Sequence, residues 1–272
     1  MARTCELADK YNADLIWFDF GINNKKERPA TENPFADHLK RFAAYYYNVA
    51  SKKGQKPVLN YKWTAYPEKT AVLDLERSKL KDIRKLFWQT DTSVATNTWS
   101  YVDKIKYKTP DRLIDDLIDI VSKNGCLLMN VCPRADGSIP PEQVKMLTEF
   151  GSWLKVNGEA IYGSRPFKIF GEGPTATIEG HVSENKNKPF GAKDIRFTTK
   201  GDQLYAIALG KPETNKLLIT TMKSGNEYKA SIKKVEMLGH DGKLAWSQTD
   251  QGLEIEFPQT LPCEFAFTFR IQ

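Results

Sequence analysis

Apolar residues in the first part of the chain form short continuous runs that alternate with segments of helical period. Residues 15–18 are all apolar and predict a buried strand, preceded by a short helix at residues 5–11. Apolar side chains recur over residues 35–50 at the three-to-four spacing of an amphipathic helix, which Gly54 ends. Residues 58–61 predict a second strand.

The same alternation continues along the chain. Residues 87–92 end a third strand, and the next helix begins with Thr109 as its cap and stops at Gly125. Residues 126–131 are a continuous apolar strand, after which another helix begins near Pro140. Strands that are buried on both faces and separated by helices predict parallel β/α units over residues 1–167.

The pattern then changes to short β-rich runs separated by turn residues. Gly201-Asp202 and Asp241-Gly242 are typical of hairpins. Residues 168–272 therefore predict an antiparallel β-sandwich, whose clearest strands are residues 195–198, 203–207, 217–221, 253–257 and 265–269.

Composition narrows the class of protein. The 272 residues carry 40 basic and 34 acidic side chains, a net charge of +6, and are 40% hydrophobic, which is ordinary for a globular protein. The positive charge is spread along the chain, which favours solvated loops over a nucleic-acid surface. The four cysteines form no CxxC pair and the three histidines are far apart, so a zinc site is not expected. No run approaches the roughly 20 apolar residues of a membrane helix.

Polar residues at the carboxyl ends of the predicted strands are candidates for chemistry, because in a (β/α) barrel these ends form the active site. Asp19 directly follows the first strand and lies between Trp17 and Phe20. Such an acid is either functional or structural, for example a helix cap or a partner of Asn23 or Asn24. Aromatic, amide and carboxylate groups also follow the second and third strands, as is typical of sugar sites.

Glycoside hydrolysis needs two carboxyl groups, which lie roughly 5 to 5.5 Å apart in retaining enzymes. Glu76 is a second candidate acid, on the loop after the second strand, but its neighbour Arg77 allows the alternative of an exposed ion pair of little energetic value. The sequence lacks a P-loop, a GxGxxG fingerprint, a Gly-x-Ser-x-Gly elbow and a His-Glu-x-x-His helix. Most nucleotide enzymes, serine hydrolases and zincins are thereby excluded.

Several segments, in order, resemble the family 29 glycoside hydrolases, the α-L-fucosidases. The last of them, residues 153–167, is very specific, and the resemblance extends more loosely into the sandwich, where residues 194–202 are most similar. The other matching segments are residues 13–19, 87–93, 99–101, 113–117, 123–130 and 133–140.

The resemblance implies a retaining exo-α-L-fucosidase that uses no cofactor or metal. Asp19 matches the family's nucleophile, and Glu76 is the candidate acid/base, with Glu68 on the same loop as its rival. The implied substrate-binding residues are Trp17, Lys62 and Trp99. A lysine near Asp19 would lower the pKa of that carboxyl, whereas Arg77 close to Glu76 would oppose the proton that an acid must hold.

One departure from the family concerns the start of the barrel. Family members carry earlier strands and a histidine-rich segment that grips fucose, whereas this chain reaches Asp19 after eighteen residues and has no histidine before His38. We therefore expect an α/β fold consisting of an incomplete (β/α)8-like barrel, with later strands only, followed by the antiparallel β-sandwich. Such a chain alone is expected to fold poorly or to be inactive, because open sheet edges are exposed.

Three hypotheses of function follow from the sequence. The first is an α-L-fucosidase acting on fucosylated oligosaccharides or glycoconjugates, with Asp19 and Glu76 as its pair. The second is a non-catalytic carbohydrate-binding or structural fragment of a fucosidase, and the third is a different barrel glycosidase. The first residues lack the apolar core of a signal peptide, and the family resemblance alone suggests export. Neither nucleic acid nor a membrane span is expected, and the sequence specifies no oligomeric state.

Overall fold

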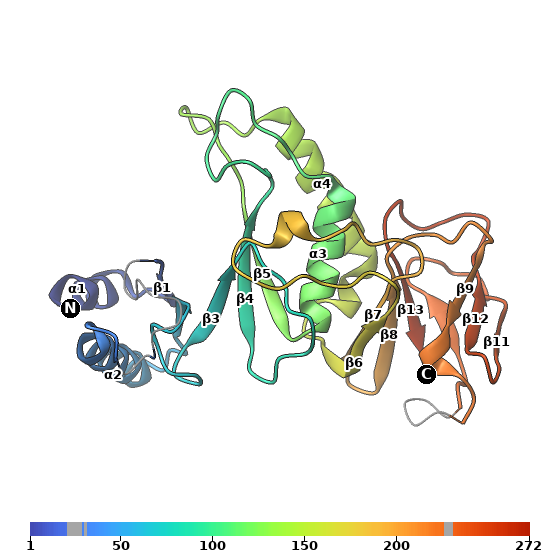
Figure 1. Cartoon of the computed structure of the whole chain (residues 1–272), viewed down its shortest axis with the longest axis horizontal. Helices are drawn as coiled ribbons and strands as arrows, with labels where there is room; N and C mark the ends of the chain where they lie inside the picture. Colours follow the sequence, from blue (N-terminus) through green and yellow to red (C-terminus); the bar gives the residue numbers. More distant parts are fainter. Residues whose placement is uncertain (21–28, 30–31, 226–230) are drawn as a thin grey trace.

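The first half of the chain forms a curled parallel sheet with helices packed on it, and the second half forms a β-sandwich (Figure 1). The computed structural model describes residues 1–20, 29, 32–225 and 231–272. The elements of the first half are α1 (Ala2–Tyr11), β1 (Leu15–Phe18), α2 (Ala36–Lys52), β2 (Val58–Lys62), β3 (Val72–Glu76), β4 (Trp88–Ser93), α3 (Pro110–Ser122), β5 (Gly125–Asn130) and α4 (Pro141–Asn157).

The parallel sheet has the strand order β1-β2-β3-β4-β5, and all its neighbouring pairs are parallel. The carboxyl ends of the five strands therefore meet at one edge, which positions the candidate site. Among the described residues, β1 pairs only with β2 and β5 only with β4, so the sheet is open. The expected incomplete barrel is confirmed.

The strand β3 was not predicted, and the expectation that Glu76 lies on a loop is wrong, because Glu76 is the last residue of that strand. The sequence reads poorly as a strand because a charged residue, Asp74, interrupts it. Asp74 is nevertheless buried, since the Lys62 ammonium lies 2.7 Å from one of its carboxylate oxygens.

The second half has two antiparallel sheets, with orders β10-β13-β8-β7-β6 and β11-β12-β9, as the sequence predicted. Apolar side chains of both sheets form one core between them. The expected boundary between residues 167 and 168 lies within β6. The elements are η2 (Gly158–Ala160), β6 (Arg165–Glu172), η3 (Glu184–Lys186), β7 (Ile195–Lys200), β8 (Gln203–Ala208), β9 (Lys216–Ile219), η4 (Thr220–Met222), β10 (Val235–Met237), β11 (Trp246–Gln248), β12 (Leu253–Glu256) and β13 (Phe267–Ile271).

Helices α3 and α4 lie between the parallel sheet and the sandwich (Figure 1). Thr109 caps α3 by accepting a hydrogen bond from the Arg112 backbone N–H at 3.2 Å, as predicted. Apolar residues of α3, α4 and β8 form a second core that joins the two halves. None of the helices in the described ranges is long and apolar enough to cross a membrane.

Buried charges also join the two halves. Asp119 of α3 is fully buried and accepts from Arg196 Nε of β7 at 2.6 Å, while the Lys123 ammonium lies 2.8 Å away. Burial alone would raise the pKa of Asp119, but these cations hold it below its usual value. The carboxylate is therefore ionised and compensates two buried cations.

We expect Asp119→Asn to destabilise the protein by about 3–5 kcal/mol, because it leaves Arg196 and Lys123 without a buried counter-charge. Urea denaturation followed by tryptophan fluorescence measures the change. Glu254→Gln is the control, since it removes an exposed pair with Lys216 and should have little effect. Equal effects of the two substitutions would contradict the importance of the buried cluster.

Asp115 makes stability depend on pH. Burial raises its pKa to about 9, and its Oδ1 has no hydrogen-bond partner. The unfolded carboxyl ionises near the ordinary value of 3.8, so the folded state holds more protons between about pH 4 and pH 9, and stability falls as the pH rises through this interval.

Asp115→Asn keeps a neutral side chain and should therefore stabilise the protein at pH 8 by up to about 5 kcal/mol, with little effect at pH 4. Denaturation at a series of pH values measures this, and the exposed Asp202→Asn is the control. A stability difference that does not change with pH would contradict the assignment.

Candidate active site

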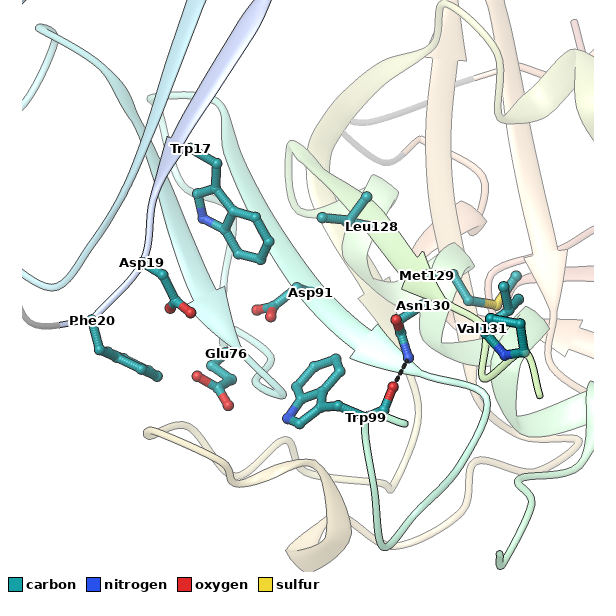
Figure 2. Close-up of a pocket in the computed structure, with 11 residues that line it drawn as sticks. Trp17, Asp19, Phe20, Glu76, Asp91, Trp99, Leu128, Met129, Asn130 and Val131 are labelled. Carbon is teal, nitrogen blue, oxygen red and sulfur yellow. Dashed lines mark hydrogen bonds between the residues drawn. The ribbon is translucent and has the colours of Figure 1, made fainter. Parts of the chain in front are cut away.

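The candidate site is a pocket at the carboxyl edge of the parallel sheet. Asp19 follows β1, Glu76 ends β3, and the Asp91 side chain comes from β4 (Figure 2). The pocket has a volume of about 850 Å³. It is lined by Trp17, Asp19, Phe20, Glu76, Asp91, Trp99, Leu128, Met129, Asn130, Val131 and Pro133.

Four of the five site residues expected from the sequence line this pocket together: Trp17, Asp19, Glu76 and Trp99. Figure 2 shows the carboxyl groups of Asp19 and Glu76 on the same side of the pocket, with the rings of Trp17 and Trp99 beside them. Parallel strands bring these residues together although Asp19 and Trp99 are far apart in sequence. Asn23 and Asn24, the alternative partners of Asp19, lie outside the described residues.

Lys62, the fifth expected residue, lies at the end of β2 and carries the charge that neutralises the carboxylates. Its ammonium is 2.7 Å from Asp74, 2.6 Å from Asp91 and 3.9 Å from Glu76. Burial would lower the pKa of Lys62, but the attraction of Asp74 and Asp91 outweighs it and raises the pKa. The lysine is therefore charged, and within the described ranges its ion pairs are with these carboxylates and not with Asp19.

The Lys62 ammonium also faces aromatic rings. It lies 5.0 Å from the centre of the Trp17 ring and 5.4 Å from that of Phe20, which are cation–π distances. In the part of the chain that the structure describes, no three His, Cys, Asp or Glu side chains are arranged to hold a metal ion.

Glu76 has the electrostatic surroundings of a proton donor. Burial raises its pKa, and the negative charges of Asp91 and Asp19 add to this effect, while Lys62 and Arg77 oppose it. The net result is a raised pKa, so the carboxyl group keeps its proton to higher pH than an exposed glutamate. A general acid at near-neutral pH requires such a shift.

Arg77 does not form the exposed pair with Glu76 that the sequence allowed as an alternative. Its backbone φ of 43° turns the residue out of the strand direction, and its side chain is buried. The guanidinium donates to the Ala95 carbonyl at 3.0 Å and lies 2.7 Å from the Glu184 carboxylate. The charge that was expected to oppose the Glu76 proton is therefore paired elsewhere.

Glu68, the rival acid, lies outside the pocket. Its side chain is 70% exposed and pairs with Arg84 at 2.8 Å. Its carboxyl group therefore faces solvent and an arginine, not the pocket. The geometry thus favours Glu76 over Glu68 as the candidate acid.

Sequence reasoning gave no role to Asp91 or Asn130, although both lie in segments that it singled out. Asp91 was recognisable as a charged residue inside a strand, where a buried carboxylate requires a partner. Asn130 ends β5 and donates to the Trp99 carbonyl at 2.8 Å, which fixes the loop that carries this tryptophan. The sequence feature that could have indicated Asn130 as a site residue is its position as a polar amide directly after an apolar run.

Carboxylates and aromatic rings at the carboxyl edge of a curled parallel sheet are the arrangement typical of glycoside hydrolases built on barrels. Comparison with known proteins specifies the family. The α-L-fucosidase family model matches residues 1–159, and the model of the α-L-fucosidase C-terminal domain matches residues 188–272. The chain therefore belongs to the α-L-fucosidase family.

Individual relatives agree with this assignment. Tissue α-L-fucosidase of Mus musculus is 29% identical over 282 residues, which cover 100% of this chain and 56% of that protein. The Bos taurus protein of the same name is 30% identical over 289 residues, covering 100% of this chain and 53% of its own length. The chain thus spans about half the length of these relatives.

A solved structure shows the same fold. Thermotoga maritima α-fucosidase in complex with fucose superimposes with a TM-score of 0.73 at 24% identity, over 100% of this chain and 55% of that one. At this level of identity the likeness concerns the fold alone.

We expect Lys62→Met to destabilise the protein more at pH 8 than at pH 5, by about 3–5 kcal/mol at the higher pH, because Asp74 and Asp91 would then be buried as uncompensated anions. Burial raises the pKa of Asp74 to about 6, so at lower pH this carboxyl can take up a proton, which relieves the repulsion. Urea denaturation at both pH values measures the difference.

The exposed Lys104→Met serves as the matched control. A loss of stability that is the same at both pH values would mean that Lys62 acts through packing and not through its charge.

Proposed function

We propose that the chain hydrolyses terminal α-L-fucosyl linkages of oligosaccharides or glycoconjugates with retention of configuration. In this mechanism Asp19 attacks the anomeric carbon and forms a covalent glycosyl-enzyme, while Glu76 gives its proton to the leaving oxygen. Glu76 then takes a proton from water, which hydrolyses the intermediate. The observation that carries the proposal is the meeting of Asp19 and Glu76 in one pocket with Trp17 and Trp99.

The two carboxyl groups have different surroundings, as their different roles require. Glu76 is partly buried and has a raised pKa, which suits the acid. Lys62 pairs with both Asp74 and Asp91 beside the pocket, so its positive charge offsets part of the negative charge near the nucleophile. The rings of Trp17 and Trp99 offer apolar faces on which the C–H face of a sugar can stack.

A second candidate function is non-catalytic binding of fucosylated glycans. It is favoured by the open sheet, whose strands β1 and β5 each have one unpaired edge within the described residues. The chain also spans about half the length of its relatives. In this case the aromatic pocket would bind sugar without turnover.

Hydrolysis of an aryl α-L-fucoside by the purified 272-residue chain would support the proposal and contradict the inactivity expected of an open barrel, and Asp19→Gly should abolish this activity. Azide added to Asp19→Gly should restore turnover and yield a fucosyl azide, because the anion takes the place of the missing carboxylate. Product analysis by NMR measures both results. Glu68→Gln is the matched control and should leave the activity unchanged, since Glu68 is exposed outside the pocket.

Glu76→Gln should lower kcat/KM by about 10²–10⁴ for a leaving group that needs protonation and much less for a dinitrophenyl leaving group, because kcat/KM reports the step that forms the glycosyl-enzyme. Binding of fucose to the wild-type chain without any turnover would overturn the hydrolytic proposal and support the binding function. Turnover that survives Asp19→Gly without azide would overturn the role of Asp19.

A further inference from the structure

The segment that joins β6 to β7 (residues 173–194, here called the return segment) runs from the sandwich back to the candidate site (Figure 1). The Val182 N–H donates to the Glu76 carbonyl at 3.1 Å, and the Glu184 N–H donates to the Arg77 carbonyl at 2.8 Å. These bonds fix the backbone of the candidate acid itself. The return segment is therefore part of the structure that supports the pocket.

The Glu184 side chain is buried and surrounded by donors. It lies 2.7 Å from Arg77 Nη1 and 2.8 Å from the Lys108 ammonium, and it accepts from the Thr92 hydroxyl at 2.5 Å. Burial would raise the pKa of Glu184, but Lys108 and the hydrogen bonds hold it below the usual value. Glu184 is therefore an anion, fixed through both of its oxygens.

Arg77 connects Glu184 to the pocket wall. Its guanidinium donates to the Thr98 carbonyl at 2.9 Å and lies 4.1 Å from the centre of the Trp99 ring. Trp99 lines the pocket, and Glu76 directly precedes Arg77 in the chain. The Arg77 guanidinium therefore contacts the Trp99 ring of the pocket and belongs to the residue next to the candidate acid Glu76.

We propose that Glu184 is a positioning residue for the acid/base Glu76. Glu184 binds the Arg77 guanidinium beside Trp99 and compensates its positive charge. Without this anion the positive charge of Arg77 would act fully on the Glu76 carboxyl and favour loss of its proton. The inference depends on the role of Glu76 in the proposed function. The charged groups near Glu76 include Lys62 on β2, Asp74 on β3, Asp91 on β4 and Asp19 after β1, in addition to Arg77 itself. Lys79, Glu179 and His181 line a cavity together with Glu76.

The charge of Glu184 is tested by two substitutions with opposite expected effects. Glu184→Gln keeps the shape but leaves Arg77 uncompensated, so the basic limb of the kcat/KM profile should move to lower pH by about one unit. Arg77→Met removes the cation and should move that limb to higher pH. The double variant should behave like Arg77→Met, because without the arginine the charge of Glu184 has little left to compensate.

A second readout does not require turnover. The carboxyl ¹³C signal of Glu76, assigned by its loss in Glu76→Gln, reports the pKa directly in an NMR titration. If the wild-type chain proves inactive, the proposed function fails, and the titration still decides the role of Glu184. If Glu184→Gln does not fold, the shift in Arg77→Met decides it.

Glu159→Gln is the control, because it removes a partly exposed pair with Arg270 in the sandwich, away from the pocket. It should leave the Glu76 titration unchanged. A merely structural Glu184 would lower stability and overall rate while leaving the pKa of Glu76 where it is. Unchanged titration in both Glu184→Gln and Arg77→Met, or shifts of the same sign, would overturn the proposal.

Discussion

The pocket depends on the position of a single ammonium group, that of Lys62. Asp74, Asp91 and Glu76 come from adjacent strands, and two like charges about 4 Å apart near a protein surface repel by about 4 kcal/mol. Lys62 lies between these carboxylates and makes their closeness tolerable. With this cation in place, neighbouring strands can all present carboxylates at one edge of the sheet.

The same principle of compensation recurs at the junction between the two halves of the molecule. Two buried carboxylates there each form ion pairs with two cations. Asp119 pairs with Arg196 and Lys123. Glu184 pairs with Arg77 and Lys108. Buried charges of this kind contribute little net stability, but they tolerate few alternative arrangements because an unpaired partner is costly. They specify how the helical layer, the sandwich and the pocket fit together.

Much of the fold could be predicted from sequence because apolar runs report burial directly. The run at residues 15–18 and the one at residues 126–131 were read as strands, and β1 and β5 lie there. The strand β3 was missed because Asp74 is buried by virtue of a partner on another strand, which no local pattern reveals. For the site, residues at strand ends could be named, whereas the pairing of Arg77 with Glu184 spans 107 positions and depends on tertiary structure alone.

The distance in sequence between Arg77 and Glu184 also determines the order in which the pocket can be assembled. The Glu76 and Arg77 backbone receives its bonds from Val182 and Glu184, so these bonds cannot form until the ribosome has released more than a hundred further residues. The Asp19 side of the pocket, which β1 and β2 build, has no such requirement. During synthesis the Glu76 side of the pocket therefore stays unfinished until residues 182–184 have emerged, and the pocket becomes complete late.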